Sequence, residues 1–261
     1  MSDLSRQAAA EPGCNHCTFG LIVTGKGERE FLPELFSVLT KWSGCSFRVI
    51  RKVDQRGPIT KKASLKMVGR RSVIPDKDAV ELGLAARGFL RNHACRFVIV
   101  VDDVEKERRG DLPAIWARYR TAVDTMLHVE ERERASVHFL ANMLEAYYFA
   151  NCNAVNAALG ALVLALDYEG DVEDIPHPKH ELERAAQLAG KSFNERRDGT
   201  TIVRNLDVEH ILAKADTCAF LRSLFAWCTR QLLARCPIWD TSIANAFALK
   251  DGIQADLTRH Q

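Results

Sequence analysis

Two short clusters of polar residues each follow an apolar run that is typical of a buried strand. The first is the turn 24–28, with the sequence TGKGE, and the second is the segment 102–105, with the sequence DDVE. Ligands of open parallel sheets bind beyond the carboxyl ends of the strands. Clustered carboxylates there suit a hard cation such as Mg²⁺ or Mn²⁺. We therefore expect Asp102, Asp103 and Glu105 to bind the cation, within reach of Glu28.

Each cluster also has a plainer interpretation. The acids at 102–105 are close in sequence to Lys106, Arg108 and Arg109, so they can form a solvated, charge-balanced turn. Glu28 can be an ordinary first-turn acid that interacts favourably with the helix dipole. The glycine turn lacks the full pattern of a phosphate-binding P-loop, so nucleotide hydrolysis is not indicated.

A basic segment lies between the two clusters. Residues 47–71 contain nine lysines and arginines against a single acid, Asp54. Such a segment suits contact with the phosphate backbone of a nucleic acid, and a mobile, solvated loop explains it equally well. The candidate nucleic-acid-binding residues are Lys26, Arg56, Lys61, Lys62, Lys66, Arg70 and Arg71.

The chain has eight cysteines, which we expect to be reduced thiols. Cys14 and Cys17 have the spacing of half a zinc knuckle. A structural zinc needs four ligands, and no second motif of this kind follows in the sequence. Residues 1–18 are therefore expected to be a flexible N-terminal tail.

The composition is that of an ordinary globular protein, with 261 residues, 47% hydrophobic residues, 27% charged residues and a net charge of +2. No apolar stretch is long enough to span a bilayer. The first eleven residues have no apolar core typical of a signal peptide. We expect a cytoplasmic protein without membrane contact, and a homo-oligomer is possible.

The hydrophobic pattern places these residues on an alternating set of strands and helices. Strands are expected at 19–24, 47–53, 96–101 and 136–140, with helices between them and another opening near Asn142. Alternation of this kind predicts an α/β fold with a mostly parallel sheet flanked by helices. Beyond residue 150 the pattern is helical, with clear helices at 207–215 and 216–233. We expect an α/β domain at 19–150 and a C-terminal helical portion at 151–261 packed on it.

The order of the motifs resembles the Toprim-like superfamily, which has the topoisomerase-primase fold. A strand ends in a Gly-x-x-Glu turn, a second strand ends in paired acids, and the sequence NMLEAYYFA follows at 142–150. Shorter matches are PK at 178–179, KSF at 191–193 and CAFLRSL at 218–224. The resemblance covers residues 19–233 and is greatest to small proteins of bacterial defence loci, often encoded beside ATPases.

The resemblance implies a Mg²⁺-dependent nuclease that works with an ATPase partner against foreign nucleic acid, DNA or RNA. Glu28 would be the general acid or base, Asp102 and Asp103 would bind the metal with Glu105, and Glu145 would add a third carboxylate. Where the pattern usually begins with a glutamate, this chain has Thr24, which is neither a proton acceptor nor a strong Mg²⁺ ligand.

Two alternatives therefore stay open. One is a catalytically degenerate fold of the same class that acts as a binding or sensor subunit. The other is a small-molecule enzyme that uses the turn and the acids for a nucleotide.

Overall fold

The computed structural model describes residues 13–58, 76–240, 242 and 252–258. Its centre is a four-stranded parallel sheet in the order β2-β1-β3-β4. The strands are β1 (Cys17–Val23), β2 (Cys45–Lys52), β3 (Arg96–Val104) and β4 (Ala135–Ala141). β1 and β3 are adjacent, with Val23 opposite Val101. A parallel sheet covered on both faces requires nearly continuous apolar strands, which β1, β3 and β4 provide.

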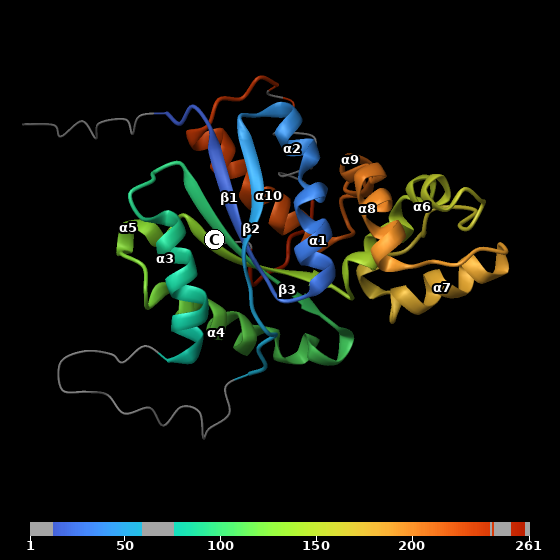
Figure 1. The fold of residues 1–261 in the computed structure, drawn as a ribbon, viewed down its shortest axis with the longest axis horizontal. Helices are drawn as coiled ribbons and strands as arrows, with labels where there is room; N and C mark the ends of the chain where they lie inside the picture. The colour runs from blue at the N-terminus through green and yellow to red at the C-terminus, as the bar shows by residue number, and fades with distance from the viewer. Residues whose placement is uncertain (1–12, 59–75, 241, 243–251, 259–261) are drawn as a thin grey trace, which may run out of the picture.

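Helices cover both faces of this sheet (Figure 1). One face packs against α1 (Lys26–Leu35), α2 (Ser37–Trp42) and α10 (Ala219–Arg235). The other face packs against the π-helical turn η1 (Ala79–Gly83), α3 (Leu84–Leu90) and α4 (Leu112–Asp124). The short helix α5 (Val129–Arg132) leads into β4. The four strands and the α/β fold class predicted from the sequence are confirmed.

The remaining helices lie beyond the carboxyl ends of the strands, in the yellow and orange part of Figure 1. They follow the 3-10 helix η3 (Leu144–Ala150), which contacts the end of β4. A second 3-10 helix, η2 (Lys106–Asp111), follows β3. The others are α6 (Cys152–Leu159), η4 (Val172–Asp174), α7 (Pro178–Leu188), α8 (Glu195–Asn205) and α9 (Val208–Ile211). Because α8 packs on both α1 and α6, this helical part contacts the first helix of the α/β part.

Three element boundaries differ from the sequence prediction. β3 continues to Val104, so both aspartates belong to the strand. The helix expected to open near Asn142 is a 3-10 helix that begins at Leu144, after two residues with positive φ. The predicted helices 207–215 and 216–233 are α9 and α10, and α10 begins after Cys218, whose φ is 57°.

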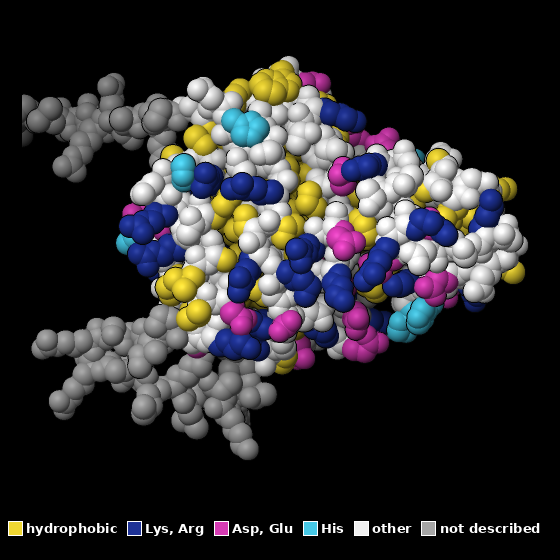
Figure 2. Space-filling model, in the orientation of Figure 1, with side chains coloured by type: hydrophobic (Ala, Val, Ile, Leu, Met, Phe, Trp, Pro, Cys, Tyr) yellow, Lys and Arg dark blue, Asp and Glu magenta, His cyan; other side chains and the backbone are white. Residues whose placement is uncertain are grey.

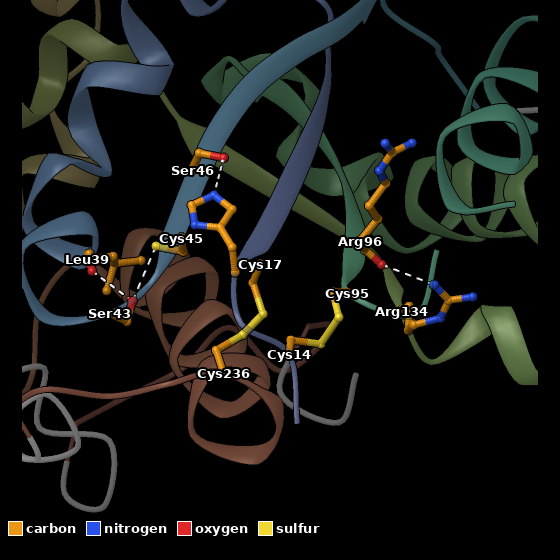
Figure 3. Close-up of a disulfide and its surroundings, with 11 residues drawn as sticks. Cys14, Cys17, Leu39, Ser43, Cys45, Ser46, Cys95, Arg96, Arg134 and Cys236 are labelled. Carbon is orange, nitrogen blue, oxygen red and sulfur yellow. Dashed lines mark hydrogen bonds between the residues drawn. A yellow bond between two sulfur atoms is a disulfide. The ribbon is translucent and has the colours of Figure 1, made fainter. Parts of the chain in front are cut away.

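The cysteines also differ from the prediction of reduced thiols. Two disulfides join Cys14 to Cys95 and Cys17 to Cys236 (Figure 3). The last residues of the predicted flexible tail are therefore fixed, since Cys14 is buried and Cys17 begins β1. Sequence spacing did not reveal this because each partner lies more than eighty residues away. No helix within the described ranges is both long enough and apolar enough to cross a bilayer.

The packing of α3 on the sheet generates a stability prediction. A Cβ atom at Gly20, in β1, would lie 2.7 Å from the Phe89 ring and 3.0 Å from Ile50. We expect Gly20→Ala to lower the free energy of unfolding by about 1–3 kcal/mol, because overpacking forces the neighbours apart. Gly88→Ala is the matched control, since a Cβ there meets no atom within 4 Å. That change should stabilise α3 by roughly 0.5–1 kcal/mol. Denaturant unfolding of both variants checks the pair, and equal effects would contradict the packing argument.

Candidate active site

The sequence-predicted site residues come from three elements that meet at the carboxyl edge of the sheet. Thr24 follows β1, and Glu28 is in the first turn of α1. Asp102 and Asp103 lie near the end of β3, while Glu145 is in η3, just after β4. All five are buried. Glu28 lies near enough to Asp103 for its charge to raise the pKa of that carboxyl group, as the shared edge of the sheet predicts.

Asp102 and Asp103 point to opposite faces of the sheet, because side chains alternate along a strand. Asp102 faces α4, where its Oδ2 accepts hydrogen bonds from Tyr119 (3.1 Å) and from Arg108 (2.8 Å). Its Oδ1 accepts a hydrogen bond from the Thr24 hydroxyl at 2.8 Å. Both oxygens of this fully buried carboxylate are thus used. The two aspartates that we expected to bind one cation therefore have different partners on opposite faces of the sheet.

A backbone group in the loop that follows β4 holds the Asp103 side chain. The Met143 N–H donates to Asp103 Oδ1 at 2.8 Å. Asn142 and Met143 have φ values of 53° and 74°, a left-handed region that is costly for residues with a side chain. The Asn142 side chain stabilises this bend by donating to the carbonyl oxygens of Glu173 and Ile175, at 2.8 and 2.9 Å. The strained turn therefore aims an N–H group at Asp103.

The Glu28 carboxyl group folds back over the turn that precedes α1. A Cβ at Gly25 would overlap Glu28 Oε2, so a side chain at this position would displace the carboxyl group. Glu28 Oε2 is buried, and no hydrogen-bond partner for it is found within the described residues. An unpaired buried carboxylate oxygen is costly. We call this close contact between the Glu28 carboxyl group and the Gly25 backbone the cradle at Gly25.

Glu28, Asp103 and Glu145 form what we call the carboxylate cluster. Burial raises the pKa of Asp103 to about 8, and the charge of Glu28 adds to this effect. Burial, followed by the nearby charge of Glu195, raises the pKa of Glu145 to about 7. The pKa of Glu28 is raised by the same two causes in the same order. Burial and the neighbouring negative charges thus favour the protonated form of each of the three groups.

Three residues outside the predicted site border the cluster: Lys179, Glu195 and Tyr148. Lys179, at the start of α7, forms an ion pair of 2.7 Å with Glu195, at the start of α8. A Cβ at Gly27 would lie 2.8 Å from Glu195 Oε1, which places this carboxylate against the glycine turn. The hydroxyl of Tyr148 is buried beside the same charges, with no partner found among the described residues. The Asn194 side chain caps the N-terminus of α8. An asparagine at this position is a sequence signal for a helix start, and it could have predicted that Glu195 lies in the first turn of a helix.

The other predicted site residues lie away from the cluster. Glu105 is exposed at the start of η2, beside a small surface pocket that it shares with Asn142 and Pro178. Lys26 is exposed on α1. Arg56 is buried and forms ion pairs with Asp78, at 3.0 Å, and with Glu81, so it is not free to bind a phosphate backbone. The remaining predicted nucleic-acid-binding residues lie outside the described ranges: Lys61, Lys62, Lys66, Arg70 and Arg71.

The donor set of the carboxylate cluster fits a hard cation. All of its donors are carboxylate oxygens, which Mg²⁺ and Mn²⁺ prefer. The unpartnered Oε2 of Glu28 supplies a coordination position. In the ligand-free arrangement, no three His, Cys, Asp or Glu side chains of the described segments are grouped to hold a metal ion. Glu28, Asp103 and Glu145 are the residues that would hold one.

Comparison of the chain with protein-family models, with curated proteins and with solved structures gave no match. The chemistry of the site is therefore argued from the geometry of the site itself.

The raised pKa of Asp103 predicts how stability depends on pH. A carboxyl whose folded-state pKa is raised contributes stability that is lost as the pH rises through that value, here about 8. Asp103→Asn cannot ionise, so its melting temperature should match that of the wild type in acid and exceed it increasingly from about pH 5 to about pH 8. Thermal unfolding over this range, in the presence of a chelator, checks the prediction.

Asp102→Asn is the matched control for that experiment. It leaves Arg108 without its buried carboxylate, so it should destabilise the protein at neutral pH by about 3 kcal/mol or more. Identical pH profiles for Asp103→Asn and the wild type would contradict the assignment of Asp103 as the raised group.

Proposed function

We propose that the carboxylate cluster binds Mg²⁺ or Mn²⁺ and that the chain hydrolyses phosphodiester bonds of nucleic acid. The observation that carries this proposal is that Glu28, Asp103 and Glu145 are buried near enough for the charge of Glu28 to raise the pKa of both other groups. None of the three forms an ion pair within the described residues, although Asp102 and Glu195 nearby each have one. A divalent cation is the partner that would relieve the repulsion among them.

A bound cation would neutralise charge on the scissile phosphate and lower the pKa of a water molecule. The chain's own residues complete the site. Glu28 would hold the cation through its Oε2, which is buried and has no hydrogen-bond partner among the described residues. The Met143 N–H fixes one oxygen of Asp103, which leaves the other to face Glu28 and Glu145. Thr24, Arg108 and Tyr119 hold Asp102 and thereby the end of β3, which makes them positioning residues.

Exposed basic side chains on β2 and α1 support nucleic acid as the substrate. Arg48 and Arg51 are exposed on the edge strand β2, and Lys26 and Arg29 are exposed on α1. Figure 2 shows lysine and arginine side chains gathered over the face that carries these elements. Cations in such an array bind phosphates with a strong dependence on salt concentration. These four residues take the place of Arg56 in the predicted interface.

The motif resemblance extends the proposal to a biological setting. It supports an ATPase partner and a role in defence against foreign nucleic acid, as in the small Toprim-like proteins. The cluster itself supports only the cation and the phosphoester chemistry.

A second candidate function is a non-catalytic subunit that binds nucleic acid. The interaction that favours it is the Thr24–Asp102–Arg108 arrangement. Thr24 stands where a carboxylate is usual in the resembling family, and Arg108 neutralises Asp102. Thr24 has no charge, and the charge of Asp102 is neutralised. The strand ends therefore have two fewer free carboxylates that could bind a catalytic cation.

Cation-dependent cleavage tests the first candidate. The purified chain is incubated with single-stranded DNA, duplex DNA and RNA, each with Mg²⁺ or Mn²⁺, and divalent affinity is measured by calorimetry. We expect Asp103→Asn to lose cleavage by about 10²-fold or more, since it removes a ligand and a charge. Glu105→Gln is the matched control and should leave cleavage unchanged, because Glu105 is exposed and lies outside the cluster.

The outcomes separate the two candidates. Cleavage that persists in Asp103→Asn contradicts the cation mechanism. Salt-dependent nucleic-acid binding without cleavage of any substrate supports the second candidate. In that case Thr24→Glu, which restores the missing carboxylate, is the variant in which cleavage should appear.

The cradle at Gly25 gives a further test of cation binding that leaves the charge unchanged. Gly25→Ala places a methyl group where Glu28 Oε2 lies, so the carboxyl group must move out. We expect the affinity for Mn²⁺ to fall about tenfold or more, because the site loses one oxygen ligand. Gly57→Ala is the control, since a Cβ there meets no atom within 4 Å. Equal affinities in calorimetry would exclude Glu28 as a ligand.

A further inference from the structure

Four cysteines meet at the edge of the sheet opposite the carboxylate cluster (Figure 3). Cys17 begins β1, and Cys95 immediately precedes β3. Cys236 follows the last turn of α10, and Cys14 lies three residues before β1. The two disulfides bring their Cα atoms to 5.6 Å (Cys14 and Cys95) and 6.2 Å (Cys17 and Cys236).

Backbone hydrogen bonds join the two disulfides into one group. The Cys14 N–H donates to the carbonyl oxygen of Arg235, the residue before Cys236, at 2.8 Å. The N–H of Thr18, the residue after Cys17, donates to the carbonyl oxygen of Cys95 at 3.0 Å. Backbone segments that carry a cysteine of one disulfide therefore lie beside segments that carry a cysteine of the other, and Figure 3 shows the two bridges near each other. As disulfides, the four side chains of this described part of the chain are not grouped to hold a metal ion, and only their reduction would free the sulfur atoms to do so.

The sequence Cys14-Asn-His-Cys17 has the spacing of half a structural zinc site, and the fold supplies the other half. Cys95 and Cys236 are the two ligands that no second motif provides. Four thiolates are the ligand set of many tetrahedral structural zinc sites. We propose that Cys14, Cys17, Cys95 and Cys236, when reduced, bind one Zn²⁺ through their four thiolates, and that the two disulfides are the oxidised form of this site.

The four positions differ in exposure. Cys95 and Cys236 are half-buried, so a reductant and a metal ion can reach them. Arg96, the chain neighbour of Cys95, donates to the carbonyl oxygen of Phe89 and lies over the Phe89 ring, away from the sulfur atoms (Figure 3). Cys45 is buried opposite Cys17 in the sheet and is the nearest cysteine outside the proposed set in that register.

The zinc-bound and disulfide forms of the four cysteines interconvert by two-electron steps. A dithiol reductant gives two electrons and two protons to each disulfide and becomes a disulfide itself. The four cysteine thiols then bind Zn²⁺ and release four protons. In the reverse direction two molecules of hydrogen peroxide, each a two-electron oxidant, take up four protons and leave two disulfides, free Zn²⁺ and four molecules of water.

Metal content and spectroscopy of the full chain test this site. The wild type is reduced with a dithiol, desalted without oxygen, and titrated with Zn²⁺ and separately with Co²⁺. We expect one equivalent of either metal to bind, with the sulfur-to-metal charge-transfer and intense visible bands of a tetrahedral Co²⁺ thiolate site. Hydrogen peroxide should then release the metal and remove four titratable thiols.

Two variants show which thiols are used. Cys236→Ser should lose stoichiometric Zn²⁺ binding, and Cys45→Ser, the matched neighbour, should retain it. The wild-type titration does not depend on either variant folding. Reduced wild type that shows all of its thiols but binds neither metal overturns the proposal, and so does unchanged binding in Cys236→Ser. Binding of iron in preference to zinc overturns the choice of metal.

Discussion

The alternation of side chains along β3 is the constraint on which the candidate site depends. Because the strand continues through Asp102 and Asp103, these neighbours cannot serve the same ion from the same face. Asp102 enters the layer beneath α4 and is neutralised there by Arg108. Asp103 enters the layer beneath α1, where it meets Glu28 and becomes part of an acidic cluster. One strand end thus provides an aspartate that is neutralised by an arginine and, beside it, an aspartate with no ion pair among the described residues.

The sequence predicted the sheet well because each strand is a compact apolar run bounded by turns. It also predicted that Glu28 and the aspartates lie at one edge, since the carboxyl ends of adjacent parallel strands share it. Glu145 was expected there only from the motif resemblance. It could not assign Asp102, because the strand's true end lies beyond the apolar run and Arg108 is brought back by the turn η2. Glu195 was missed because its position depends on packing of α8 against α1, which no local pattern encodes.

The cysteines also show that a local sequence pattern does not predict contacts between distant parts of the chain. Their spacing indicated half of a metal site, and the missing half is separated from it by 81 and 219 residues. Only the tertiary structure brings Cys95 and Cys236 to the first motif. The central strands β1 and β3 then have cysteines at their beginnings and the acidic cluster near their ends. The same two strands therefore position both groups.

The place of α10 has a consequence for how the chain folds. This helix is the last long element in the sequence, yet it packs on the sheet through Trp227, whose indole meets the edges of Phe19 and Phe97. Contacts of such long sequence separation form slowly, because a large loop must close before they stabilise anything. During synthesis, β1 and β3 emerge well before the helix that covers them. Their apolar face stays open until α10 has been made, and in that interval it is a surface that chaperones would recognise.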